Sequence, residues 1–320
     1  MAGYLCRVPL RLLRHSEIDL SAWDTCVTQA EQVVPYAQSW WLQATAGRWE
    51  AVVEAGPQGE YLSVLPLPVK RRPWGREVVQ PPFTQQLGLL TTTSSGQRQL
   101  LEYLLPVHQR YSRFYSQLHT EHELDAVPLG FALTKRTTYQ LSLAPDYAML
   151  HVGYTADYRR RLRLNTEAAQ PLAVTITQNA EPLLALFQQT KGAAAGLRRS
   201  HYVMLRRLVA AGQLHGQMQL LEVRQPETDE LLAGALFVLF RTRLVYLFAA
   251  ASEAGKKAAA PLLLLDHSIR QHAGTPGLIL DFEGGMIPSI ARFFANFGAT
   301  PVSYAALSFT QRPWYLQWIR

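Results

Sequence analysis

Residues 278–299 read LILDFEGGMIPSIARFFANFGA, and this stretch decides how the second half of the chain folds. An apolar run predicts a strand over 277–282, and the pattern after Pro288 predicts a helix over 288–297. Asp281 and Glu283 stand at the strand end, where alternate residues of an extended chain share a face. Such a pair could act as a base and an orienting acceptor. A helix cap, or a pair with Arg292, is an equally open interpretation.

The segments around this stretch predict an α+β domain. Three strands with short turns come first, and they are followed by alternating helices and strands, which is typical of a mixed sheet flanked by helices. The predicted strands are 172–177, 217–223, 231–239, 244–251, 277–282 and 300–309. The predicted helices are 154–169, 181–191, 200–212, 256–273 and 288–297.

The first half repeats this order more loosely. It predicts helices over 17–32 and 94–110, a second helix that begins after residues 35–41, a hairpin of strands 49–54 and 61–69, and strands 112–118 and 130–143. A chain of 320 residues is too long for one ordinary core. We therefore expect two tandem domains, 1–146 and 147–320, linked at 144–146, and the last strand could return to the first domain.

Composition indicates an ordered protein with a basic surface. The chain is 48% hydrophobic and 17% charged, with a net charge of +7, which favours acidic or phosphate-bearing partners. The two cysteines, Cys6 and Cys26, have no metal-binding spacing, so no metal is expected. The apolar stretch 231–240 is too short to span a bilayer. No signal-peptide pattern opens the chain, so we expect a cytoplasmic protein, with peripheral membrane contact left open.

Two segments of the second half carry positive charge where a phosphate could bind. Gly255, Lys256 and Lys257 lie between a strand and an apolar helix, where backbone N–H groups and lysines could hold a phosphate. Arg159 and Arg163 share one face of a basic helix. An ordinary strand-to-helix turn and a solvated helix face are the alternative interpretations.

One loop of the first half has an unusual composition. Residues 80–88 read QPPFTQQLG, whose prolines and terminal glycine indicate a shaped loop. Such loops often face a ligand, and Gln85 and Gln86 would be its polar contacts. A rigid connector explains the same residues.

The motif over 280–299, with its Phe-x-Gly-Gly and Ala-Arg-Phe-Phe segments, resembles the C-terminal signature of GNAT-superfamily proteins related to the FemAB peptidoglycan-bridge aminoacyltransferases. Residues 35–41, 80–88, 154–163 and 244–257 resemble other parts of the same group. The resemblance implies two tandem GNAT-like domains and a substrate groove. It also implies an acyl- or aminoacyltransferase that uses acyl-CoA or aminoacyl-tRNA and serves cell-envelope biosynthesis.

The chemistry implied by the resemblance assigns roles to the candidate residues. Asp281 or Glu283 would lie near the accepting amine, and Tyr246 or Tyr304 would protonate the leaving group. The donor phosphates would contact Gly255, Lys256 and Lys257, and Arg159 and Arg163 would contact phosphates of the donor or the acceptor. The acceptor would contact Gln85, Gln86, Tyr36 and Trp40. The acceptor would be a small-molecule, peptide or glycan amine, and tRNA is a further candidate partner.

Two other classes of function stay open at this point. The GNAT fold could serve as a non-catalytic binding module, because fold does not fix function. The basic runs could instead bind nucleic acid.

Overall fold

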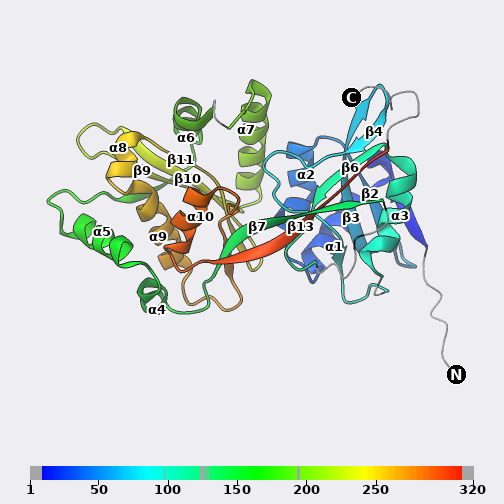
Figure 1. Cartoon of the computed structure of the whole chain (residues 1–320), viewed down its shortest axis with the longest axis horizontal. Coiled ribbons are helices and arrows are strands. Elements are labelled where there is room, and N and C mark those ends of the chain that lie inside the picture. Colours follow the sequence, from blue (N-terminus) through cyan, green and yellow to red (C-terminus); the bar gives the residue numbers. More distant parts are fainter. Residues whose placement is uncertain (1–8, 97, 123–126, 128–129, 193–194, 312–320) are drawn as a thin grey trace. The chain divides into compact units, whose positions relative to one another are not determined.

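The computed structural model describes residues 9–96, 98–122, 127, 130–192 and 195–311 of the chain (Figure 1). Cys6 lies outside these residues. The chain divides into two compact units. Unit 1 comprises Met1–Arg136 and Ser303–Arg320, and unit 2 comprises Thr137–Val302.

Unit 1 is built on a mixed sheet with the strand order β1-β2-β3-β4-β6-β13. All neighbours are antiparallel except β4 and β6, which are parallel. The strands are β1 (Leu10–Leu13), β2 (Trp49–Ala55), β3 (Tyr61–Arg72), β4 (Gly75–Val78), β6 (Arg113–Gln117) and the second part of β13 (Thr300–Thr310), while the short β5 (Leu90–Thr91) pairs with β3. The helices are η1 (His15–Glu17), α1 (Leu20–Gln29), η2 (Pro35–Ala37), α2 (Ser39–Thr45) and α3 (Leu100–Arg110).

Helices cover this sheet because each presents an apolar stripe to it. The core beneath α3 joins Leu104 and Val107 to Val52 and Phe114 of the strands. On α1, Trp23 packs against Trp49 with ring centroids 4.3 Å apart. Asp19 begins α1 by accepting the backbone N–H groups of the first turn.

Unit 2 has the strand order β7-β12-β11-β10-β9-β8, in which only β11 and β12 are parallel. The strands are β7 (Ala132–Ser142), which enters from unit 1, β8 (Val174–Thr177), β9 (Met218–Arg224), β10 (Leu231–Phe240), β11 (Arg243–Ala251) and β12 (Ile279–Asp281). The helices are α4 (Tyr147–Val152), α5 (Ala156–Glu167), α6 (Glu181–Phe187), η3 (Gln188–Gly192), α7 (Arg199–Leu214), α8 (Glu253–Lys257), α9 (Ala260–His272) and α10 (Pro288–Ala295).

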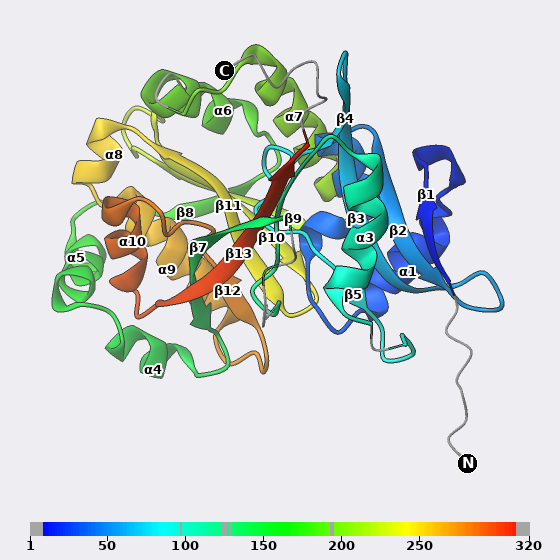
Figure 2. The same ribbon diagram turned by 45° about the vertical axis from the view of Figure 1, so that its right-hand side comes forward.

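Successive residues of β10 face opposite sides of the sheet, and a different helix covers each side. A Cβ added to Gly234 would meet Leu183 of α6 at 3.1 Å. Its neighbours Ala233 and Ala235, which point the other way, belong to the core that includes α9. The central strands of unit 2 are therefore covered on both faces, and Figure 2 shows α6 and α9 with these strands from a second direction.

The predicted α+β class is confirmed, and every predicted strand and helix has a counterpart in the structure. Two helices differ from the prediction: α3 begins at Leu100 and not at residue 94, and the predicted helix 256–273 is divided into α8 and α9. The strands β1, β4 and β5 and the helices η1, η2 and α4 were not predicted. The unit boundary falls at Arg136, inside β7, and the predicted linker 144–146 instead leads into α4, where Asp146 caps the helix. Among the described residues, no helix is long and apolar enough to cross a membrane.

Candidate functional site

The two parallel strands of unit 2 separate at the end of β12. Their pairing runs from Arg243 with Ile279 to Val245 with Asp281 and stops there. β11 continues to Ala251, still paired with β10. The chain after Asp281 turns away, so this edge of β11 has no strand partner beyond Val245 among the described residues.

A cavity of about 580 Å³ opens where the strands separate. We call this cavity the wedge. Its lining comes from residues 246–251 of β11, residues 282–284 after β12, one residue each of η3, β10 and α8, two of α9 and four of α10. Most of the lining is apolar, and its polar side chains come from Tyr246, Glu283, Lys191, Lys256 and Ser289.

Asp281 does not line the wedge. It is buried, and both carboxylate oxygens accept hydrogen bonds: Oδ1 from Thr138 Oγ1 (2.6 Å) and the Glu283 backbone N–H (3.0 Å), and Oδ2 from Gln140 Nε2 (2.9 Å). Thr138 and Gln140 belong to β7. Asp281 therefore ties the end of β12 to its neighbouring strand, neither capping α10 nor pairing with Arg292.

Glu283 and the two glycines shape the turn that borders the wedge. Glu283 has φ +56°, so the expectation that it continues the strand and shares a face with Asp281 is wrong. A Cβ on Gly284 would lie 2.6 Å from Phe294, and a Cβ on Gly285 would lie 2.4 Å from the Thr137 carbonyl oxygen. Both glycines are needed because the backbone passes this close to α10 and β7, and Glu283 is left on the wall of the wedge.

Tyr246 begins the unpaired part of β11. Its ring packs between Phe237 and Phe294, with centroid distances of 5.3 and 6.1 Å. Burial raises the pKa of its phenol, so Tyr246 keeps its proton at neutral pH. Within the described part of the chain the hydroxyl makes no hydrogen bond, and it can therefore donate one to a ligand in the wedge.

Two lysines border the wedge, of which the sequence indicated only one. Lys256 lines it and pairs with Glu253 at 2.5 Å. Lys191 of η3 also lines it, and burial together with the nearby Lys256 charge lowers the pKa of Lys191. An anionic ligand would relieve both effects. No sequence signal marked Lys191, because the chain approaches α8 there only through tertiary packing.

Gly255 and Lys257 do not take the expected positions. The Gly255 N–H donates to Ser252 Oγ at 3.0 Å, so it is not free for a phosphate. A Cβ on Gly255 would lie 2.0 Å from the Leu232 carbonyl oxygen, so this glycine allows α8 to pack against β10. Lys257 is exposed and does not line the wedge.

The arginines of α5 form a solvated face. Arg159 donates to the Val152 carbonyl at 3.2 Å, and Arg163 lies 3.7 Å from Glu167. Neither residue lines the wedge. The helix is held by Tyr158 and Leu162, which are buried.

The candidates of unit 1 gather around the loop 80–88. Gln80 Oε1 accepts from the Gln117 backbone N–H at 3.0 Å, and the Tyr304 hydroxyl donates to Gln117 Oε1 at 3.1 Å. Thr84 of the loop accepts from Trp41 Nε1, which brings α2 to the loop.

The predicted substrate contacts of unit 1 also bond within the unit. Gln86 accepts from the Thr120 N–H at 3.2 Å and donates to Gln85 Oε1 at 2.9 Å. Trp40 Nε1 donates to Gln38 Oε1, and the Tyr36 ring meets Trp41 edge-on. Contact between these residues and an acceptor stays a prediction.

Comparison with known proteins identifies the wedge-bearing segment. Residues 153–286 match the family model described as "Acetyltransferase (GNAT) domain". This part of unit 2 is therefore a GNAT domain, as the resemblance implied. No curated protein matches the sequence.

Solved structures share the fold over most of the chain. A structure of FemX is similar with a TM-score of 0.68 and 14% identity, covering 97% of this chain and 99% of that chain. The C-terminal domain of a putative lysylphosphatidylglycerol synthetase from Agrobacterium fabrum has a TM-score of 0.52 and 12% identity, with 92% of each chain covered. L-PGS from Bacillus licheniformis has a TM-score of 0.50 and 11% identity, covering 83% and 86%. At these identities the likeness concerns the fold.

Proposed function

We propose that the chain is an acyl- or aminoacyltransferase whose unit 2 binds the acyl donor in the wedge and transfers the acyl group to an amine. One observation carries the proposal: within the GNAT domain, β11 and β12 separate after Val245 and Asp281 and leave a cavity. The unpaired edge of β11 offers backbone groups to an extended donor, as an added strand would. The apolar lining suits an acyl chain or its linker.

The polar residues of the wedge supply what the reaction requires. Amine attack on an ester or thioester carbonyl needs a proton acceptor for the amine and a proton donor for the leaving group. Glu283 is the carboxylate on the wall and would accept the amine proton. Tyr246, protonated because it is buried, would donate a proton to the leaving thiolate or ribose oxygen.

Lys191 and Lys256 would contact the phosphates of the donor. Both line the wedge, and the Lys256 charge disfavours the charged form of Lys191 until an anion lies nearby. Acyl-CoA and aminoacyl-tRNA both present phosphates, so these lysines suit either donor. A peptide, glycan or lipid amine would be the acceptor, in keeping with the likeness to FemX.

Donor binding by the intact chain tests this proposal. Isothermal titration calorimetry with acetyl-CoA, and separately with aminoacyl-tRNA, should show saturable binding of one donor. Ser289→Trp should abolish that binding, because Ser289 is exposed at the wedge and a bulky ring there would block it. Met286→Trp is the matched control, since Met286 is exposed nearby but does not line the wedge.

Two results would count against the transferase. Binding of neither donor would favour the non-catalytic binding module, and equal loss of binding in both tryptophan variants would place the donor elsewhere. A melting temperature within a degree or so of the parent's confirms that the variants are folded, since exposed substitutions usually change stability by under about 0.5 kcal/mol.

A further inference from the structure

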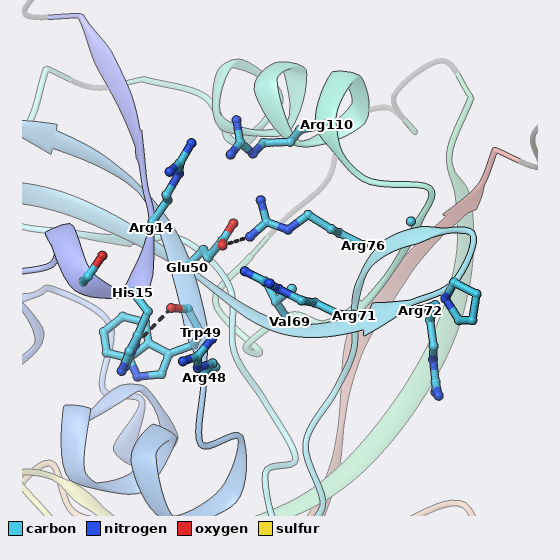
Figure 3. Close-up of a pocket in the computed structure, with 13 residues that line it drawn as sticks. Arg14, His15, Arg48, Trp49, Glu50, Val69, Arg71, Arg72, Arg76 and Arg110 are labelled. Carbon is cyan, nitrogen blue, oxygen red and sulfur yellow. Dashed lines mark hydrogen bonds and ion pairs between the residues drawn. The ribbon is translucent and has the colours of Figure 1, made fainter.

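A second, chemically different cavity lies entirely within unit 1 (Figure 3). Its volume is about 960 Å³, and six arginines line it. We call it the arginine pocket. The arginines come from separate segments: the end of β1, the start of β2, the end of β3, β4 and the last residue of α3. They are Arg14, Arg48, Arg71, Arg72, Arg76 and Arg110.

One carboxylate lies at the centre of the arginine pocket, and it already forms an ion pair with one of the arginines. Glu50 is buried, forms an ion pair with Arg76 and accepts from the Tyr111 hydroxyl at 2.5 Å. Burial raises the pKa of Tyr111 to about 12, so this phenol remains a donor. Glu50 therefore orients Arg76 and leaves little charge to neutralise the other arginines.

Four of the six arginines have no acidic partner among the described residues. Arg72 pairs with Glu77 at 3.2 Å and points away from the others in Figure 3. Arg14, Arg48, Arg71 and Arg110 make no ion pair with any residue that the structure describes. In Figure 3 the guanidinium groups of Arg71, Arg76 and Arg110 extend toward the region of Glu50. The Arg76 Nε–H is buried, and no residue that the structure describes accepts a hydrogen bond from it.

We propose that the arginine pocket binds a compact ligand with two or more linked phosphates, of the size of a nucleoside diphosphate. Unpaired guanidinium groups around one hollow repel one another, and a multivalent anion would stabilise them. Arginine forms bidentate hydrogen bonds with phosphate. Cavities of this volume hold small ligands, whereas a nucleic-acid strand needs a charged track along its backbone. The site is separate from the wedge, and the proposal stands without the transferase activity.

Calorimetry on the intact chain can test this site with simple probes. Inorganic diphosphate and ADP should bind, AMP should bind about tenfold or more weakly because it lacks one charged phosphate, and adenosine should not bind measurably. Equal affinity for diphosphate and ADP would place recognition in the phosphates alone. Tighter binding of ADP would add a nucleoside contact to the same site.

Substitutions locate the binding in unit 1. Arg48→Gln and Arg71→Gln should each weaken ADP binding about tenfold or more, since each removes charged hydrogen bonds. Arg207→Gln is the matched control: Arg207 is an exposed arginine of α7 in unit 2 without an ion pair in the described part of the chain. All three changes are at exposed positions, and circular dichroism would confirm their folding.

Three results would overturn the proposal. The first is no binding of diphosphate or ADP at millimolar concentration. The second is ADP binding that Lys191→Gln weakens while Arg48→Gln and Arg71→Gln do not, which would place the nucleotide in the wedge. The third is a short single-stranded RNA that binds more tightly than ADP and is not displaced by diphosphate, which would indicate a nucleic-acid surface.

Discussion

Among the described residues, each unit contains one pair of parallel strands whose connection includes at least one helix, and the two pairs end differently. In unit 2, β11 and β12 separate after Val245 and Asp281 and leave the wedge. In unit 1, β4 and β6 pair as far as Val78 and Phe114, and the chain then rejoins β6 through a parallel bridge between Leu87 and Leu118.

In unit 1 the loop 80–88 bonds along β6 beyond the last paired residue of β4. Gln80 accepts from the Gln117 backbone N–H, which a longer β4 would otherwise have bonded, and its amide also donates to the Thr84 carbonyl at 2.8 Å. The same fold element is therefore sealed in one unit and open in the other. Strand order alone does not determine whether a cavity remains beside a parallel pair. The residues that follow the last paired position determine this.

The largest expected effect concerns the two tyrosines proposed for proton transfer. If transfer takes place at the wedge between β11 and β12, Tyr246→Phe should lower turnover about 10²-fold to 10⁴-fold. The change removes the proton donor and keeps the packed ring. Tyr304→Phe should leave turnover within a few-fold, since its hydroxyl bonds to Gln117 inside unit 1. Steady-state kinetics with the bound donor measure both. A larger loss for Tyr304→Phe would reverse the assignment of the units.

Gly255→Ala should destabilise unit 2 by about 3 kcal/mol, because the new methyl group would meet the Leu232 carbonyl oxygen. All seven tryptophans fall in the sequence ranges of unit 1. Urea unfolding followed by circular dichroism should therefore show the loss, while the tryptophan fluorescence transition stays in place. Lys257→Ala, at an exposed position of the same helix, is the control. A shift of the fluorescence transition by the same amount would show that the units do not unfold separately.

Gln80→Ala should destabilise unit 1 by about 1–2 kcal/mol, since it leaves the Gln117 N–H without its acceptor. Tryptophan fluorescence in urea would report the change. Gln58→Ala, in the exposed turn between β2 and β3, should have no measurable effect. Donor binding should be unchanged in both variants. Loss of donor binding in Gln80→Ala alone would show that the sealed pair contributes to the donor site.

The last effect is a pH dependence of the stability of unit 1. Burial and the stacked ring of His119 lower the pKa of His122 from 6.5 to about 3, and His122 Nε2 accepts from the Leu89 N–H. Between these values the unfolded chain binds the extra proton, so stability is present above pH 6.5 and is lost as the pH falls toward 3. The slope should approach about 1.4 kcal/mol per pH unit.

His122→Gln keeps an acceptor for the Leu89 N–H without a titrating ring. The fluorescence-detected free energy of unfolding should therefore depend less on pH in this variant than in the parent. An equally steep dependence in both would assign the slope to other groups.

The sequence predicted most of the longer elements because their signals are local. Apolar alternation and turn residues gave β2 and β3, and Pro288 followed by an amphipathic run gave α10. The positions of the site residues depend on contacts between segments that are distant in sequence. The positive φ of Glu283 separates it from Asp281, and the Leu232 carbonyl, distant in sequence, explains Gly255. Lys191 and the six arginines of unit 1 come together only through tertiary packing, so no spacing could have shown them.

Hydrogen–deuterium exchange of the intact chain with saturating donor tests the central claim most directly. The unpaired edge of β11 exposes backbone amides that a bound donor would cover. We expect added protection over residues 246–251 and 282–290, and none over residues 80–88 or 113–117 of unit 1. Protection in the parallel pair of unit 1, with unchanged exchange along β11, would contradict the assignment of the donor site to the wedge.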